Sequence, residues 1–93
     1  MNATTIIPTP NARRYLGQFI KHFAYKLPFV RHESNKHKKV EFSLGLCTLD
    51  ADSARLAIIV NARTPEEMDQ LKGVVDWHLL RFAFREDLAI AWH

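Results

Sequence analysis

The sequence predicts an α+β domain, a two-layer sandwich in which two helices cover one face of a mainly antiparallel sheet of about five strands. Two stretches have apolar residues at the three- and four-residue spacing of amphipathic helices, and the segments around them alternate as strands do. The resulting order is β-α-β-β-β-α-β, for which a relative of the ferredoxin-like fold is the nearest named architecture. That architecture hosts many unrelated activities and indicates no function.

The composition is typical of a single globular domain covering residues 1–93. The chain is 47% hydrophobic and 25% charged with only three glycines, which excludes a disordered polymer. No run approaches the roughly 18 apolar residues of a membrane span, and the first residues lack the order of a secretory signal. We therefore expect a cytoplasmic protein without membrane contact. The one cysteine, Cys47, can form no internal disulfide.

The chain is expected to begin with a short strand, Thr4–Ile7, that ends at a Pro-Thr-Pro segment. Asn11 then offers a capping oxygen to a helix that runs from Ala12 to Leu27 and ends before Pro28. Its apolar residues form one helical face: Ala12, Leu16, Phe19, Ile20, Phe23 and Leu27.

Three strands are expected next, over Phe29–His32, Lys39–Asp50 and Arg55–Asn61, as an antiparallel meander with polar turns. In the middle strand, apolar residues alternate before Gly45 and resume out of phase after it. We interpret Gly45 as a β-bulge that restores the phase. The bulge would turn one set of side chains toward the helices: Val40, Phe42, Leu44, Cys47 and Leu49.

The second helix is expected to begin at Pro65, with Thr64 as its capping residue and two glutamates against the helix dipole. It runs to about Phe84. Its core face consists of Met68, Leu71, Val75, Leu79 and Phe82. Beyond it, Leu88–Trp92 alternates apolar and small residues and predicts a closing strand.

Three segments together resemble a bacterial family of small domains of unknown function, domain of unknown function 2218. They are His22–Pro28, Gly45–Leu49 and the block His78–Glu86, which reads HLLRFAFRE. The similarity spans nearly the whole chain. It implies no assigned activity, and it links some members to siderophore-utilisation genes, which is a hint about pathway. Tyr25 stands where members often carry a second histidine, and this departure weakens any metal site that needs that histidine.

Four residues form the candidate ligand-binding site: His22, Lys26, Cys47 and His78. His22 and Lys26 lie one turn apart beside the apolar face of the first helix, and His78 lies among the core residues of the second. If both helices cover the sheet face that holds Cys47, two imidazoles and a thiolate suit zinc, or a thiol nucleophile with a base. Zinc ligands are usually closer in sequence, and a strand cysteine is usually a small hydrophobe. We expect no cofactor, and the sequence leaves open whether these residues bind a metal.

Three charged residues gather at the end of the second helix: Arg81, Arg85 and Glu86. Cations favour the negative end of the helix dipole, and a carboxylate pairs with arginine. Capping and ion pairing are the expected roles, and anion binding by the two arginines is the alternative.

The second helix also has an outer stripe opposite its core face, made of Gly73, Trp77, Leu80 and Phe84. A monomer would expose these side chains, and exposed aromatic residues beside a glycine are typical of interaction surfaces. The outer stripe therefore predicts a homodimer.

These observations predict an uncharacterised bacterial accessory or ligand-binding domain, homodimeric and non-enzymatic, that takes a small ligand. The alternative is a small metal- or thiol-dependent enzyme, or an accessory factor in iron-siderophore handling, that uses the same four site residues. Nucleic-acid binding by the basic loop His32–Lys39 is not expected, because such loops are usually solvated turns.

Overall fold

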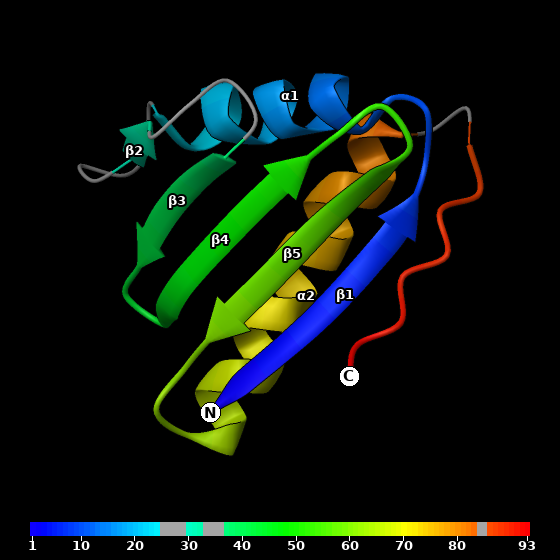
Figure 1. Ribbon diagram of the computed structural model, residues 1–93. Coiled ribbons are helices and arrows are strands. Elements are labelled where there is room, and N and C mark those ends of the chain that lie inside the picture. Colours follow the sequence, from blue (N-terminus) through cyan, green and yellow to red (C-terminus); the bar gives the residue numbers. More distant parts are fainter. Residues whose placement is uncertain (25–29, 33–36, 84–85) are drawn as a thin grey trace.

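The structure, a computed structural model, describes residues 1–24, 30–32, 37–83 and 86–93 (Figure 1). Its elements in order are β1 (Asn2–Pro8), α1 (Ala12–Ala24), β2 (Val30–His32), β3 (His37–Phe42), β4 (Gly45–Ala51), β5 (Arg55–Asn61) and α2 (Pro65–Phe82). The sheet order is β1-β5-β4-β3-β2, and every neighbouring pair is antiparallel. The sheet thus has four strands of six or seven residues and a three-residue β2 at one edge.

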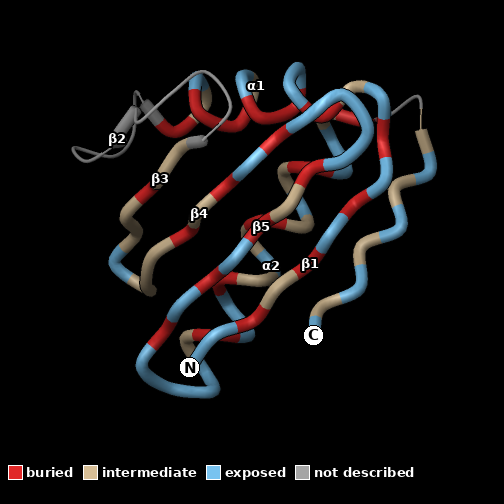
Figure 2. The backbone as a smooth tube through the Cα atoms, viewed as in Figure 1, coloured by how far each residue is buried: buried red, intermediate tan, exposed pale blue. Residues whose placement is uncertain are grey.

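Both helices lie on one face of the sheet, as predicted, and the α+β class is confirmed. Buried and exposed positions alternate along β1 and β5 (Figure 2), so that each strand turns every second side chain toward the helices. The opposite face carries the exposed side chains Ile6 and Ile59. The ferredoxin-like comparison is not confirmed, because β1 and β2, the strands before and after α1, lie at opposite edges of the sheet. In the split βαβ units of that fold, such strands flank a single inserted strand.

The prediction of one bulged strand over Lys39–Asp50 is wrong, because this segment forms two strands, β3 and β4. A turn at Ser43 and Leu44 reverses the chain between β3 and β4, and Phe42 pairs with Gly45. Gly45 has a φ of 155°, and a Cβ at this position would lie 2.1 Å from the Asn61 carbonyl oxygen. Glycine is therefore required at the start of β4, where the chain passes close to the end of β5.

The predicted facing of the side chains around this turn is nevertheless observed. Val40, Cys47 and Leu49 are fully buried, and Phe42 and Leu44 pack against the core. A hairpin and a bulge both shift the phase of the alternation, so the burial pattern is the same for the two structures.

The predicted closing strand Leu88–Trp92 is an extended segment without a ladder of its own. It runs beside β1 (Figure 1), and its backbone pairs there through the reciprocal hydrogen bonds of Thr4 with His93, at 2.8 and 3.0 Å. The Trp92 indole N–H donates to Asp76 Oδ1 of α2 at 2.9 Å. The segment is thus fixed at its end by one backbone pair and one side-chain bond.

The start of α2 follows the prediction. Thr64 Oγ1 accepts from the Glu67 backbone N–H at 3.1 Å, and Pro65 occupies the first turn. The core face is buried at Met68, Leu71, Val75 and Leu79, whereas the side chain of Trp77 is 56% exposed and that of Leu80 50%. In the part of the chain that the structure describes, no helix combines the length and the apolar character needed to cross a membrane.

Candidate functional site

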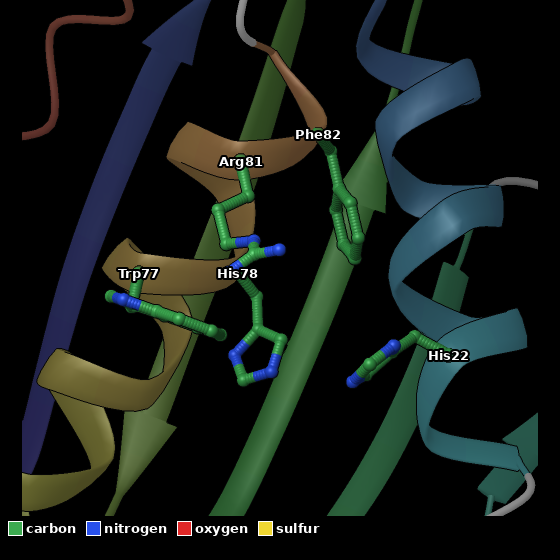
Figure 3. Close-up of a pocket in the computed structure, with 5 residues that line it drawn as sticks. All are labelled: His22, Trp77, His78, Arg81 and Phe82. Atoms are coloured by element: carbon green, nitrogen blue, oxygen red, sulfur yellow. The ribbon is translucent and has the colours of Figure 1, made fainter.

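A cavity of about 380 Å³ lies between α1 and α2, and we call it the histidine cavity. Figure 3 shows the side chains that line it: His22 from α1, and Trp77, His78, Arg81 and Phe82 from α2. The α2 residues form two adjacent pairs, 77–78 and 81–82, that lie one turn apart, so all four share one side of the helix. The cavity is therefore the place where the exposed edge of α2 meets the C-terminal half of α1.

The two histidines are neighbours, as their helical faces predicted. Their ring centroids are 4.8 Å apart, and Phe23 lies 4.8 Å from His78 on the core side. His78 Nδ1 lies 2.7 Å from the Val74 carbonyl oxygen. Because a carbonyl oxygen can only accept, Nδ1 carries the hydrogen, and in the neutral ring Nε2 is an acceptor. Its backbone bond thus fixes both the tautomer and the direction of the ring.

Arg81 supplies the positive charge of the histidine cavity. Its guanidinium carbon lies 4.5 Å from the centroid of the Trp77 ring, within the range of a cation–π contact. The planar group can stack on the indole and still offer N–H donors at its edge to an acceptor in the cavity. The predicted anion-binding alternative for this arginine therefore has a suitable position, whereas Arg85 lies outside the described residues.

Cys47 does not join the histidines. Cys47 is fully buried on β4 and does not line the histidine cavity, and burial raises the pKa of its thiol. Lys26 lies outside the described residues. Within the described ranges, no group of three His, Cys, Asp or Glu side chains that could hold a metal ion occurs. The predicted convergence of two imidazoles with a thiolate is therefore limited to the two imidazoles.

Glu86 takes a role that the sequence did not reveal. We expected it to cap α2 or to pair with an arginine, but its carboxylate lies at the start of α1. It accepts hydrogen bonds from Thr9 Oγ1 at 3.0 Å, from Asn11 Nδ2 at 3.1 Å and from the Tyr15 hydroxyl. The first turn of α1 contains no acidic residue, so this distant carboxylate supplies the negative charge that a helix N-terminus favours.

Asn11 differs from its prediction in the same cluster. Its carbonyl oxygen accepts from the Tyr15 backbone N–H at 3.1 Å, as at a helix cap, but its side-chain amide donates to Glu86. The backbone N–H of Asn11 donates to Thr9 Oγ1 at 3.1 Å. Thr9, Tyr15 and the pairing of Trp92 with Asp76 were missed, because side-chain bonds between residues far apart in sequence leave no local pattern.

The remaining interface and loop predictions are only partly within the described residues. Gly73, Trp77 and Leu80 are exposed on α2, as the outer stripe predicted, and Phe84 lies outside the described residues. The centre of the basic loop, residues 33–36, lies outside them as well.

Fold and site together define a small α+β domain with two helices on one sheet face and a cavity between those helices. This chain belongs to the bacterial family of uncharacterized proteins conserved in bacteria, domain of unknown function 2218 (DUF2218), whose model matches residues 4–93. It is similar to the NMR structure of PA4090 from Pseudomonas aeruginosa, with 28% identity and a TM-score of 0.80 over 99% of this chain and 94% of that one. It matches none of the curated proteins.

Proposed function

We propose that this chain is a homodimeric, non-enzymatic ligand-binding domain, and that its ligand is a small molecule with an anionic group attached to a flat apolar body. The histidine cavity is the observation that supports it. Small-molecule sites are usually mostly apolar hollows with a few converging polar groups, and this cavity combines two rings, Trp77 and Phe82, with the guanidinium of Arg81 and two imidazoles.

Each part of that ligand follows from a lining group. The guanidinium of Arg81 suits a carboxylate or a phosphate oxygen, because it offers paired N–H donors with a full charge. The ring of Trp77 holds this guanidinium from one side. The rings of Trp77 and Phe82, which line the cavity, suit a flat body that contacts aromatic edges and faces.

Binding is favoured over catalysis because the chain's one cysteine is poorly placed for chemistry. A nucleophilic thiol needs an exposed thiolate beside a base, whereas Cys47 is buried and its raised pKa disfavours the thiolate. The alternative, a metal- or thiol-dependent enzyme or accessory factor in iron-siderophore handling, depends on the His22–His78 pair. Metal analysis of the protein purified without a histidine tag distinguishes the two, because that alternative requires a stoichiometric metal or a reactive thiolate.

The ligand proposal is tested with two probes, benzoate and inorganic phosphate, followed by the indole N–H signals in a ¹H–¹⁵N spectrum. Benzoate should shift the Trp77 signal and leave that of Trp92, which bonds to Asp76, unchanged. Arg81→Gln should weaken benzoate binding about tenfold, because a charged hydrogen bond is lost. The matched control is Arg63→Gln, an exposed arginine outside the cavity.

Four results separate the components of the proposal. A benzoate response without a phosphate response supports the flat body as well as the charge, and equal responses support an anion site alone. Equal weakening by Arg81→Gln and Arg63→Gln would mean that the probe responds to overall charge, and the proposed site would be wrong. No shift of Trp77 at millimolar benzoate and phosphate would overturn the proposed ligand class.

A further inference from the structure

The outer stripe of α2 borders a second depression, an apolar hollow of about 540 Å³ that we call the glycine hollow. Its lining residues are Leu44, Gln70, Gly73, Val74, Trp77 and His78. The four of these that lie at i, i+3, i+4 and i+7 on α2 are Gln70, Gly73, Val74 and Trp77. This is the arrangement that accepts one side chain of a facing helix in knobs-into-holes packing.

Gly73 leaves the hollow open. A Cβ at this position would have no atom within 4 Å, so the helix backbone itself is accessible between the larger side chains. Trp77, one turn further along α2, projects from the same stripe and is 56% exposed. The stripe therefore contains both a large knob and a hole, one turn apart.

We infer that the occupant of the glycine hollow is Trp77 of a second copy of this chain, in an antiparallel, two-fold contact between two α2 helices. This inference rests on the homodimer of the proposed function and specifies its surface. A two-fold axis level with Val75 places Gly73 opposite the partner's Trp77, and by symmetry Trp77 opposite the partner's Gly73. Each Trp77 side chain then enters the glycine hollow of the other copy.

The charges of α2 agree with this register independently. Asp69 and Arg81 are both exposed and lie six residues before and after Val75. In an antiparallel pair centred there, Asp69 faces the partner's Arg81, and the same contact occurs twice. Gln70 faces the partner's Leu80 in the same way. A parallel pair would instead place like charges together, which is unfavourable.

The contact and the histidine cavity do not exclude each other, although Trp77 and Arg81 belong to both. The guanidinium has five N–H donors on two edges, so one edge can meet the partner's Asp69 while another faces the cavity. The partner's carboxylate would then act as a positioning group for the arginine that meets the ligand.

The surface is tested by sedimentation equilibrium with Gly73→Gln, which fills the hollow from a position that does not line the histidine cavity. The matched control is Gly17→Gln, because Gly17 is an exposed helical glycine on α1 that also has no atom within 4 Å of its Cβ position. The unchanged protein and Gly17→Gln should be dimers, and Gly73→Gln should be a monomer that still unfolds in one cooperative thermal transition. The benzoate response, measured on the same Gly73→Gln protein, reports the ligand site separately.

The register is tested by exchanging the two charges. Asp69→Arg and Arg81→Asp should each raise the dimer dissociation constant about tenfold or more, because each breaks two symmetric pairs and creates two like-charge contacts. The double variant restores both pairs and should return the constant to about threefold of the original, within the additivity of paired changes. A dimer that Gly73→Gln leaves intact, or a double variant as weak as the single ones, would overturn this contact while leaving dimerisation itself standing. A monomer at every concentration would overturn both.

Discussion

Replacing Glu86 with alanine should destabilise this protein more than the exposure of that residue suggests. Its carboxylate accepts from three side chains of the β1–α1 region: Thr9, Asn11 and Tyr15. Thr9 and Tyr15 are almost fully buried, so their hydroxyls would lose an acceptor in a place where water cannot easily replace it. Removing the charged partner of a buried donor costs about 1–3 kcal/mol per donor. Because such costs are not additive, we expect a loss of about 3 kcal/mol in the free energy of unfolding.

Urea unfolding followed by far-ultraviolet circular dichroism measures this loss. Glu86→Gln keeps the size and one acceptor oxygen but loses the charge, and should cost about half as much as alanine. Asp87→Ala is the control. Asp87 is the exposed neighbour of Glu86, and its replacement should change stability by less than about 0.5 kcal/mol. Tyr15→Phe, combined with Glu86→Ala in a double-mutant cycle, should show a coupling energy well above zero. If Glu86→Ala costs no more than Asp87→Ala, the carboxylate does not hold α1 in the way that its hydrogen bonds indicate.

Three further predictions concern single residues. Gly45→Ala should lower the free energy of unfolding by about 2–4 kcal/mol, because its Cβ would lie 2.1 Å from the Asn61 carbonyl oxygen and the backbone must shift. Gly17→Ala on α1 should instead raise the free energy of unfolding by about 0.5–1 kcal/mol. Equal effects of the two changes in urea unfolding would contradict this. Burial raises the pKa of Asp76 above its usual range, so ionisation of this carboxyl opposes folding. The stability of Asp76→Asn relative to the unchanged protein should therefore rise from roughly pH 3 to pH 6. A relative stability that falls over that range would refute the assignment. Cys47, fully buried, should react with a thiol reagent slowly in buffer and rapidly in urea, and rapid labelling in buffer would reopen the thiol-enzyme alternative.

The helices and the capping of α2 could be predicted because they depend on local patterns. Thr64 and Pro65 are a cap and a first-turn residue whatever the rest of the chain does. The hairpin between β3 and β4 could not be predicted in the same way, because alternation reports which side chains are buried and is blind to the direction of the chain. Leu44 is also an unusual residue for a turn, so the usual composition signal was missing.

The C-terminal segment shows the same limit from the other side. Leu88, Ile90 and Trp92 do turn inward and their neighbours outward, as the alternation predicted. Yet this segment joins the sheet through the single residue pair of Thr4 and His93. Side-chain burial and backbone pairing are separate properties, and only the first leaves a period of two in the sequence.

The candidate site, too, could be predicted only where local patterns determine it. His22 and His78 could be placed together because each lies on a predictable side of its helix, and both helices cover one sheet face. Cys47 could not be separated from them, because a residue that faces the helices can still lie beneath the core side chains and away from a surface cavity. The partners of Glu86 are more than 70 residues away in sequence, and no local spacing rule reaches that far.

The block His78–Glu86, which contributes most to the family resemblance, is better understood as several adjacent roles than as one motif. Successive residues of an α-helix point about 100° apart, so neighbours in this block face different surroundings. His78 and Arg81 line the histidine cavity, Leu79 lies in the core, and Leu80 is exposed on the outer stripe. Changes to Leu79 should therefore reduce folding, and changes to Leu80 should reduce assembly. Changes to Arg81 should reduce ligand binding and also assembly, because Arg81 faces the partner's Asp69 in the proposed contact. Glu86, beyond the end of the helix, fixes the opposite helix instead. A scan of this block that lowered all three properties together at every position would show that the residues act as one structural unit, and the separate binding site would then lose its support.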